Sequence, residues 1–335
     1  MTATPKKTIV VLGATGNQGG SVARTFSSLP NWHVRCVTRN PSSAAAGTLS
    51  RLGAEIVQAD LADLDSLVRA FSSANAIFAN TDLWATVSDP GTAAKAEAAG
   101  KSSSELAMDV EVSHGVNIAH AAAGVATLER FIYSALGPMN QASKGKYTHS
   151  YHWEAKAKIV EYIETQQPAL ARSMSVIYLG AYVTNPALYP RWDEQARQYV
   201  LGLPMTKDAE MPIIDPTEST GPFVRALVED EDPGKRLLAY DSNSNLRMGD
   251  LAEMWKRVLA RDVALVYVPL EAMQERTGWP IEVLEGPAFI SEFGYMHGVD
   301  NVIVPAQLKN KVVTKSFEEW LKERSWGELL DQSKT

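Results

Sequence analysis

Short apolar segments alternate with longer segments of helical spacing through the first 180 residues. Strand-length apolar runs lie at 8–14, 32–40, 54–60, 75–81, 130–136 and 171–182. Apolar positions repeat at helical spacing in the intervening segments 17–29, 43–53, 64–74, 105–125 and 152–166. Strands that alternate with helices form βαβ units, which give a parallel sheet covered on both faces. We therefore predict an α/β fold built on a doubly wound parallel sheet.

The alternation weakens after Pro186. Proline-rich segments join short apolar runs there, and helical spacing returns at 250–260 and 316–325. We predict two domains, the sheet domain at 1–185 and a smaller C-terminal α/β lobe at 186–335. The lobe is expected to pack over the carboxyl edge of the sheet and to form a substrate cleft with it.

One long segment interrupts the pattern directly after the fourth predicted strand. Residues 82–105 are rich in Ala, Gly and Ser. Ligands of doubly wound sheets bind beside the carboxyl ends of the strands, where this segment begins. It is therefore either a mobile lid or a solvated insertion without a role.

Three glycines at a spacing of three follow the first predicted strand and open the first predicted helix. Gly13 permits the tight turn, Gly16 lets the backbone approach a pyrophosphate, and Gly19 lets helix and strand pack closely. The helix N-terminus adds free N–H groups and a positive dipole end. The pattern predicts a dinucleotide site, and hence a Rossmann-type NAD(P)-binding domain. Further contacts are expected from the loop residues Thr15, Asn17 and Gln18.

The end of the second predicted strand bears on the choice of cofactor. NAD-preferring sites usually carry an acidic residue there, whereas this strand ends in Thr38, Arg39 and Asn40. Arg39 can pair with a 2′-phosphate, so we expect NADP, bound as NADPH. The other strand ends supply the remaining predicted cofactor contacts, Asp60, Leu61, Asn80, Thr81 and Tyr178.

The segment 150–164 carries the candidate catalytic groups. Lys156 follows His152 by four residues, so the two share a helix face. Short-chain dehydrogenases have a tyrosine and a lysine at this spacing, with the tyrosine as general acid and the lysine on the nicotinamide ribose. Here His152 occupies the tyrosine position, and Tyr151 is one residue out of register. His152 is expected to titrate near neutral pH and donate a proton.

Two other roles remain open for Lys156. It acts alone through a water, or it only anchors the ribose. Ser134, at the end of the fifth predicted strand, is a candidate hydrogen-bond donor to a substrate carbonyl. The aromatic-rich segment 284–298 is either a cap over an apolar ligand or ordinary core.

Composition excludes several other classes of function. The net charge of −7 and the isoelectric point near 5.5 argue against binding to nucleic acid. One cysteine and six scattered histidines provide no metal-ligand spacing, so no metal site is expected. No apolar run approaches the length of a membrane span, which predicts a soluble, cytoplasmic protein.

These motifs together resemble the NmrA-like family of atypical short-chain dehydrogenases. The resemblance rests on 10–24, 53–71, 75–84, 130–137 and the helix that carries His152 and Lys156. It implies one of two activities, because some members are reductases related to isoflavone and quinone reductases and others are dinucleotide-sensing regulators that bind proteins. We predict an NADPH-dependent reductase of a small aromatic or conjugated carbonyl compound, a quinone or ketone. The alternative is an NADP(H)-sensing regulator with a protein partner and no turnover.

Overall fold

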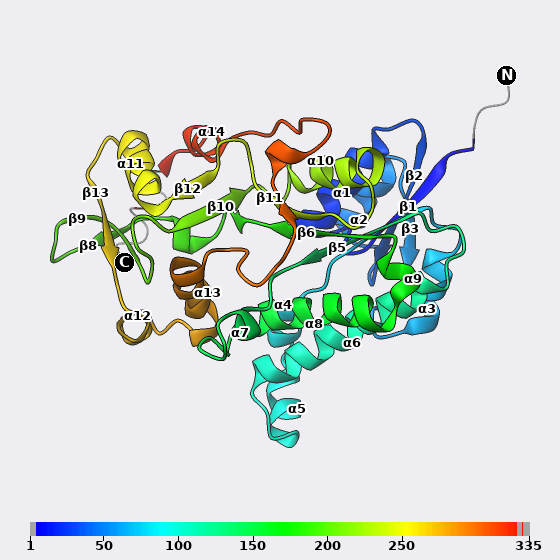
Figure 1. The fold of residues 1–335 in the computed structure, drawn as a ribbon, viewed down its shortest axis with the longest axis horizontal. Coiled ribbons are helices and arrows are strands. Elements are labelled where there is room, and N and C mark those ends of the chain that lie inside the picture. The colour runs from blue at the N-terminus through cyan, green and yellow to red at the C-terminus, as the bar shows by residue number, and fades with distance from the viewer. Residues whose placement is uncertain (1–4, 327–329, 331–335) are drawn as a thin grey trace.

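An eight-stranded parallel sheet forms the centre of the larger part of the molecule (Figure 1). The computed structural model describes residues 5–326 and residue 330. Strand order across the sheet is β14-β11-β6-β5-β4-β1-β2-β3. The strands are β1 (Lys7–Val11), β2 (Trp32–Thr38), β3 (Glu55–Gln58), β4 (Ala76–Ala79), β5 (Arg130–Ala135), β6 (Met174–Leu179), β11 (Arg236–Ala239) and β14 (Val302–Ile303). The predicted doubly wound α/β fold is confirmed.

Helices cover both faces of this sheet because alternate residues of its strands point to opposite sides. Ile9 and Val11 of β1 pack with Phe26 of one helix layer, whereas Val10 packs with Ile159 of the other. The first layer contains α1 (Asn17–Ser27) and α10 (Thr220–Arg225), which continues into a π-helical turn (Ala226–Asp230). The second contains α3 (Leu64–Phe71), α6 (Ser103–Ala123), α8 (Tyr151–Gln166) and α9 (Pro168–Ala171). A short helix α2 (Ala44–Arg51) links β2 to β3.

The chain returns to the large sheet after forming part of the second lobe. Strands β11 and β14 both come from beyond residue 186, and α10 packs against α1. Gly221 makes this contact close, since a Cβ there would overlap the Ser21 carbonyl, and its N–H donates to Ser21 Oγ at 2.9 Å. The predicted boundary at residue 185 therefore does not separate the sheet from the rest of the molecule.

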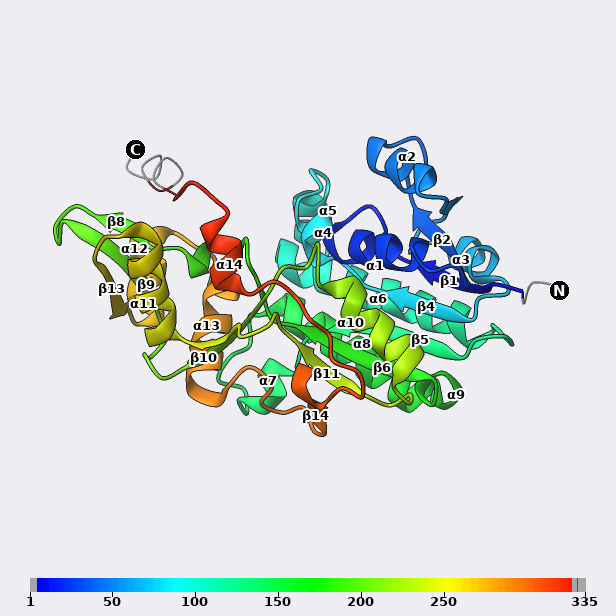
Figure 2. The same ribbon diagram turned by 90° about the horizontal axis from the view of Figure 1, so that it is seen from above.

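The smaller lobe lies at the other end of the molecule (Figures 1 and 2) and combines two three-stranded sheets with helices. One sheet has the order β12-β10-β7, and the other has the order β13-β9-β8. Its strands are β7 (Ala181–Tyr182), β8 (Arg191–Asp193), β9 (Gln198–Leu203), β10 (Glu210–Ile214), β12 (Asn245–Arg247) and β13 (Val263–Tyr267). Its helices are α11 (Met248–Leu259), α12 (Leu270–Thr277), α13 (Ile281–Phe293) and α14 (Phe317–Lys322). A 3₁₀ turn, Pro186–Leu188, completes this region, and a second, Pro305–Gln307, follows β14 and contacts β11 of the large sheet.

The segment 82–105 is helical and projects from the molecule. It forms α4 (Leu83–Val87), α5 (Thr92–Ala98) and the first turn of α6, whose Ser102 and Glu105 make a capping box. Figure 1 shows α5 at the tip of a protrusion below the main body. A further short helix, α7 (Met139–Ala142), follows β5.

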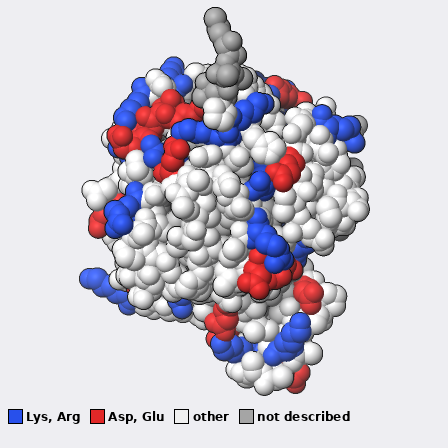
Figure 3. Space-filling view, turned by 90° about the vertical axis from the view of Figure 1, so that its right-hand side faces the viewer, with Lys and Arg blue, Asp and Glu red and all other residues white. Residues whose placement is uncertain are grey.

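Two surface properties bear on possible partners. On the face shown in Figure 3, Lys and Arg side chains are interspersed with Asp and Glu side chains. Within residues 5–326, no helix combines the length and apolar character needed to cross a membrane.

Candidate cofactor and substrate cleft

A cleft of about 720 Å³ lies at the carboxyl ends of β1, β4, β5 and β6. One part of its wall comes from the segments at the carboxyl ends of these four strands, Gly16–Gln18, Asn80–Asp82, Ser134–Leu136 and Leu179–Tyr182. Residues of the smaller lobe close the opposite side. This is the edge at which doubly wound sheets bind nucleotides, because several strand ends and one helix N-terminus meet there.

The glycine turn has the geometry that its spacing predicts. Gly13 has φ of +61°, in the left-handed region that glycine adopts without strain. A Cβ on Gly13 would also overlap the Asn80 side chain, and a Cβ on Gly19 would overlap the Gly13 carbonyl. Gly16 is the N-cap residue of α1. The turn thus brings the helix N-terminus against β1 and β4 with backbone alone.

Two amide side chains beside this turn carry buried oxygens without a hydrogen-bond partner among the described residues. They are Oε1 of Gln18 and Oδ1 of Asn80. The other end of Gln18 is held, because its Nε2 donates to the hydroxyl of Tyr182 at 2.6 Å. Thr15, Gly16 and Asn17 are exposed. Free backbone, a helix N-terminus and unsatisfied amide oxygens fit a polar ligand such as a dinucleotide.

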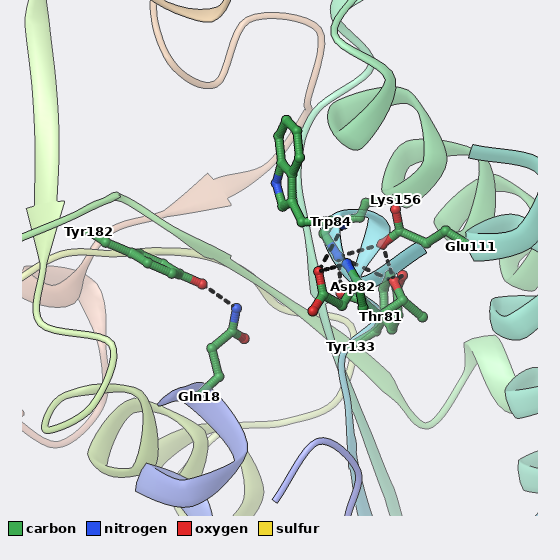
Figure 4. Close-up of polar contacts among 9 residues, drawn as sticks. Gln18, Thr81, Asp82, Trp84, Glu111, Tyr133, Lys156 and Tyr182 are labelled. Atoms are coloured by element: carbon green, nitrogen blue, oxygen red, sulfur yellow. Dashed lines mark hydrogen bonds and ion pairs between the residues drawn. The ribbon is translucent and has the colours of Figure 1, made fainter. Parts of the chain in front are cut away.

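Lys156 of α8 lies on the opposite side of the cleft in a buried hydrogen-bond network (Figure 4). Its Nζ donates to the Thr81 carbonyl at 2.6 Å, to Thr81 Oγ1 at 3.2 Å and to Glu111 Oε1 at 2.8 Å. Thr81 in turn donates its hydroxyl to Glu111 Oε1 at 2.6 Å and lies 2.9 Å from the Tyr133 hydroxyl. Burial raises the pKa of Tyr133 well above its usual value, so this hydroxyl keeps its proton.

Glu111 is the site residue that sequence reasoning missed. It lies on α6, and its side chain is fully buried. The helical pattern of the sequence does mark this residue, because Glu111 lies on the same helix face as Ala107, Gly115 and Ile118, all of which are buried. Gly115 lets α6 approach α8 closely, because a Cβ there would overlap Ile159. A carboxylate on the apolar face of a helix requires a partner, and α8 supplies Lys156.

His152 lies where we expected it but does not have the expected acidity. It lines the cleft four residues before Lys156, and its ring centroid is 5.3 Å from that of Trp84. Desolvation by burial, with a smaller contribution from the charge of Lys156, lowers the pKa of His152 to about 4. The prediction that His152 titrates near neutral pH is therefore wrong. At neutral pH it is an uncharged ring, and its Nδ1 is buried without a hydrogen-bond partner within the described chain.

The smaller lobe contributes an apolar chamber to the cleft. Ser134 lies at the junction, buried at the end of β5 and lining the cleft beside Leu136. Part of the aromatic-rich segment 284–298 lines the chamber, and the remainder packs into the core. The apolar lining consists of Leu136, Trp153, Leu188, Leu203, Met205, Met211, Trp279, Val283, Pro287, Ile290 and Tyr295.

The remaining predicted cofactor residues fall into two groups. Arg39 and Asp60 are exposed at the carboxyl ends of β2 and β3, and Leu61 is half-buried against the core. Tyr178, by contrast, is buried in the core, and burial raises the pKa of its hydroxyl to about 12. It is not among the described residues that line the cleft, so the structure gives no support to a cofactor contact there. Strand alternation gives the reason, because Tyr178 points to the face covered by α8 and α9.

The fold and the cleft define a Rossmann-type α/β protein, the class in which nucleotide cofactors bind at this sheet edge. Within that class the chain belongs to the NmrA-like family, whose model matches residues 5–321. The family resemblance noted in the sequence is therefore confirmed.

Relatives with curated descriptions are fungal NmrA-like family domain-containing oxidoreductases. FrzB of Cladobotryum sp. is 32% identical over 188 residues, which cover 55% of this chain and 46% of FrzB. The relative malD of Malbranchea aurantiaca is 28% identical over 239 residues, 68% of this chain and 66% of malD. The chain thus spans less than half the length of FrzB.

Solved structures share the fold at low identity. NmrA, described as a negative transcriptional regulator, in complex with NADP has a TM-score of 0.66 at 21% identity, covering 97% of this chain and 92% of NmrA. Isoflavone reductase has a TM-score of 0.66 at 15% identity, covering 95% and 99%. The leucoanthocyanidin reductase of Vitis vinifera in complex with NADPH has a TM-score of 0.64 at 15% identity, covering 94% and 98%. At these identities the likeness shows the fold alone.

Proposed function

We propose that the protein is an NADPH-dependent reductase of a small, uncharged aromatic or conjugated carbonyl compound. The proposal rests on one cleft that combines three features: the glycine turn at the N-terminus of α1, which forms a cradle for a dinucleotide, the buried Lys156, and an apolar chamber. The oxidoreductase relatives and the NADPH-bound reductase of the same fold support the reaction class.

The residues of the cradle fit the dinucleotide. The turn at Gly13, Gly16 and Gly19 would hold the pyrophosphate at the N-terminus of α1 through backbone N–H donors, and the free Gln18 and Asn80 oxygens would accept hydrogen bonds from hydroxyl groups of the dinucleotide. The exposed guanidinium of Arg39 at the end of β2 favours NADPH over NADH, because it suits a 2′-phosphate. When bound, NADPH supplies a hydride.

The chain's own groups act on the charge that develops when the carbonyl carbon accepts that hydride. Negative charge forms on the substrate oxygen, and the Lys156 ammonium is the cation of the cleft wall. The Ser134 hydroxyl is a hydrogen-bond donor on the same wall. The neutral His152 ring contributes shape and excludes water rather than supplying a proton as an imidazolium.

The substrate class follows from the chamber. Among the described residues that line the cleft, Asp82 and Lys156 are the only acidic or basic side chains apart from the neutral His152. Trp153, Trp279 and Tyr295 offer ring surfaces, and the methionines Met205 and Met211 adapt to irregular shapes. An anionic substrate would lose its hydration without a compensating partner in the apolar chamber, so we expect a neutral, flat compound.

A panel assay tests this function. Purified protein is incubated with NADPH and a set of quinones, aromatic aldehydes and aromatic ketones, and cofactor oxidation is followed at the nicotinamide absorbance. Lys156→Ala is expected to lower turnover by at least about 100-fold, since removing one preorganised group that stabilises an oxyanion has effects of this size. Lys158→Ala is the matched control, because Lys158 is an exposed lysine of the same helix. Unchanged turnover in Lys156→Ala, with an active wild type, would contradict the proposal.

A second function is favoured by one specific contact. Asp82 follows Thr81, the residue on which Lys156 is bound, and caps α4 through its side chain. A cofactor that alters the Lys156–Thr81 contact would therefore act directly on the segment 82–105, whose α5 projects from the molecule. The protein would then be an NADP(H) sensor that binds a protein partner. Limited proteolysis tests this, because cleavage of 82–105 that is the same with and without NADPH would contradict it.

A further inference from the structure

We propose that Glu111 is a positioning residue that holds Lys156 as a permanent cation, so that the proton of the product hydroxyl comes from water and not from the lysine. The inference deepens the proposed function and rests on it. It concerns the buried side of the network in Figure 4, which faces away from the cleft.

The first step of the argument is the burial of the ion pair. The side chain of Glu111 has an exposed fraction of 0% and that of Lys156 has one of 14%, with 2.8 Å between Oε1 and Nζ. If Lys156 gave up its proton, Glu111 would remain a buried carboxylate without a cationic partner. Breaking a buried pair in this way is strongly unfavourable, so the pair as a whole opposes proton donation by the lysine.

The second step is the direction of every donor in the network. The Lys156 ammonium donates to Thr81 and Glu111, and the Thr81 hydroxyl also donates to Glu111 Oε1. Tyr133 keeps its proton and faces Thr81 Oγ1. Both contacts of Glu111 Oε1 are therefore with donors, the Lys156 ammonium and the Thr81 hydroxyl, which is the arrangement of an ionised carboxylate.

The third step is the second oxygen of Glu111. Oε2 is buried and has no hydrogen-bond partner among the described residues. The Lys156 ammonium is therefore the cation that compensates the buried Glu111 carboxylate, and this ion pair fixes the position of the ammonium. Cation and carboxylate together hold Nζ at the Thr81 carbonyl, on the cleft wall.

The reaction then balances without a proton from Lys156. Bound NADPH would supply a hydride to the carbonyl carbon and become NADP⁺, while the C=O π electrons would move to oxygen. The Lys156 ammonium would stabilise that oxyanion, which would take its proton from water and leave hydroxide. Neutral His152 supplies no imidazolium at this pH.

The test measures Lys156 directly and does not require turnover. Wild type, Glu111→Gln and Glu231→Gln are treated with acetic anhydride at pH 8, and acetylation of Lys156 relative to exposed Lys158 is measured by mass spectrometry. Glu231 is the matched control, a buried carboxylate 3.9 Å from Lys235 and remote from the lining of the cleft. We expect the Lys156 ratio to rise at least about tenfold in Glu111→Gln and to stay unchanged in Glu231→Gln.

An unchanged Lys156 ratio in Glu111→Gln would overturn the proposal. If that variant does not fold, Glu111→Asp, which withdraws the carboxylate by one methylene, is expected to raise the ratio, and an unchanged ratio there would overturn it equally. In the NADPH oxidation assay, Glu111→Gln is expected to lose rate between pH 7 and pH 9 while wild type retains it. If the pH profile of Glu111→Gln runs parallel to that of wild type, Glu111 has only a structural role and the proposal is overturned. If Lys156 is acetylated faster in Glu111→Gln but neither wild type nor any variant turns over, Glu111 still positions Lys156, and the proposed reductase function is contradicted.

Discussion

His152 shows how the surroundings of a single residue decide its chemistry. Its position on α8 is that of the tyrosine general acid of short-chain dehydrogenases, and imidazole in water would titrate in the physiological range. Here the ring is buried beside Trp84 and lies one helical turn from the Lys156 ammonium. Both surroundings disfavour the charged form, so the residue is a neutral wall of the cleft.

This environment makes stability depend on pH. The imidazole of the unfolded chain takes up a proton near pH 6.5, whereas the folded protein does so only near pH 4. The unfolded state therefore binds more protons between these values, and stability falls as pH is lowered through that window. We expect His152 to account for a loss on the order of 2–3 kcal/mol between pH 7 and pH 4.

Urea unfolding of wild type and His152→Gln at pH 7.5, 5.5 and 4.5 measures this contribution. The variant keeps a polar side chain but has no titrating group at this position. Its stability is expected to fall less steeply with acid than that of wild type. Parallel pH dependence of the two proteins would show that His152 is not held neutral.

At the scale of elements, the contact between α6 and α8 builds the lysine site. Glu111 and Lys156 belong to different helices, and they meet because Gly115 removes the side chain that would separate those helices at Ile159. The strand ends Thr81 and Ser134 are placed by the same sheet on which both helices pack. Small residues on α6, including Ala107, Ala119 and Ala122, are buried along this helix.

Enlarging Gly115 tests the importance of this close approach. Gly115→Ala gains helix propensity of about 1 kcal/mol but overpacks against Ile159, which costs about 1–3 kcal/mol. We expect a net destabilisation of roughly 1 kcal/mol and a weaker hold on Lys156. Gly47→Ala is the control, since Gly47 lies within α2 with only the end of Arg51 near its Cβ position. It is expected to be neutral or stabilising.

A double mutant makes the interpretation specific. Ile159→Ala removes the atoms that the new methyl group would meet, so the double variant Gly115→Ala, Ile159→Ala is expected to lose less stability than the sum of the two single changes. Additive losses in urea unfolding would contradict a steric origin.

The sequence predicted those elements whose pattern is local. The six strands and the glycine turn are confirmed, and the predicted site residues Asn80, Thr81, Ser134 and Lys156 all line the cleft. Glu111 was missed because its role depends on a packing contact between helices distant in sequence. The acidity of His152 was misjudged because desolvation depends on Trp84, which lies 68 positions earlier and comes from the interrupting segment. The orientation of Tyr178 could not be predicted, because all six residues of its strand are buried and no polar alternation marks the two faces.

At the scale of the whole molecule, the cleft depends on how the chain is routed. The smaller lobe is not a separate C-terminal unit, because β11, β14 and α10, which come later in the chain than residue 186, pack in the Rossmann-type part of the molecule. That return anchors the segments between them, including the strands and helices that supply the apolar chamber. The two parts of the cleft are thus joined by several chain crossings as well as by the cleft itself, which favours a preformed site.

Binding of the reduced cofactor tests the central claim most directly. Wild type is titrated by calorimetry with NADPH, NADP⁺, NADH and NAD⁺, and Arg39→Ala is titrated in parallel. We predict that NADPH binds most tightly, that it is preferred over NADH by at least about tenfold, and that this preference is reduced in Arg39→Ala because a charge-assisted contact to the 2′-phosphate is lost. Equal or tighter binding of the oxidised forms would favour the sensor over the reductase. Absence of binding by all four would contradict the account.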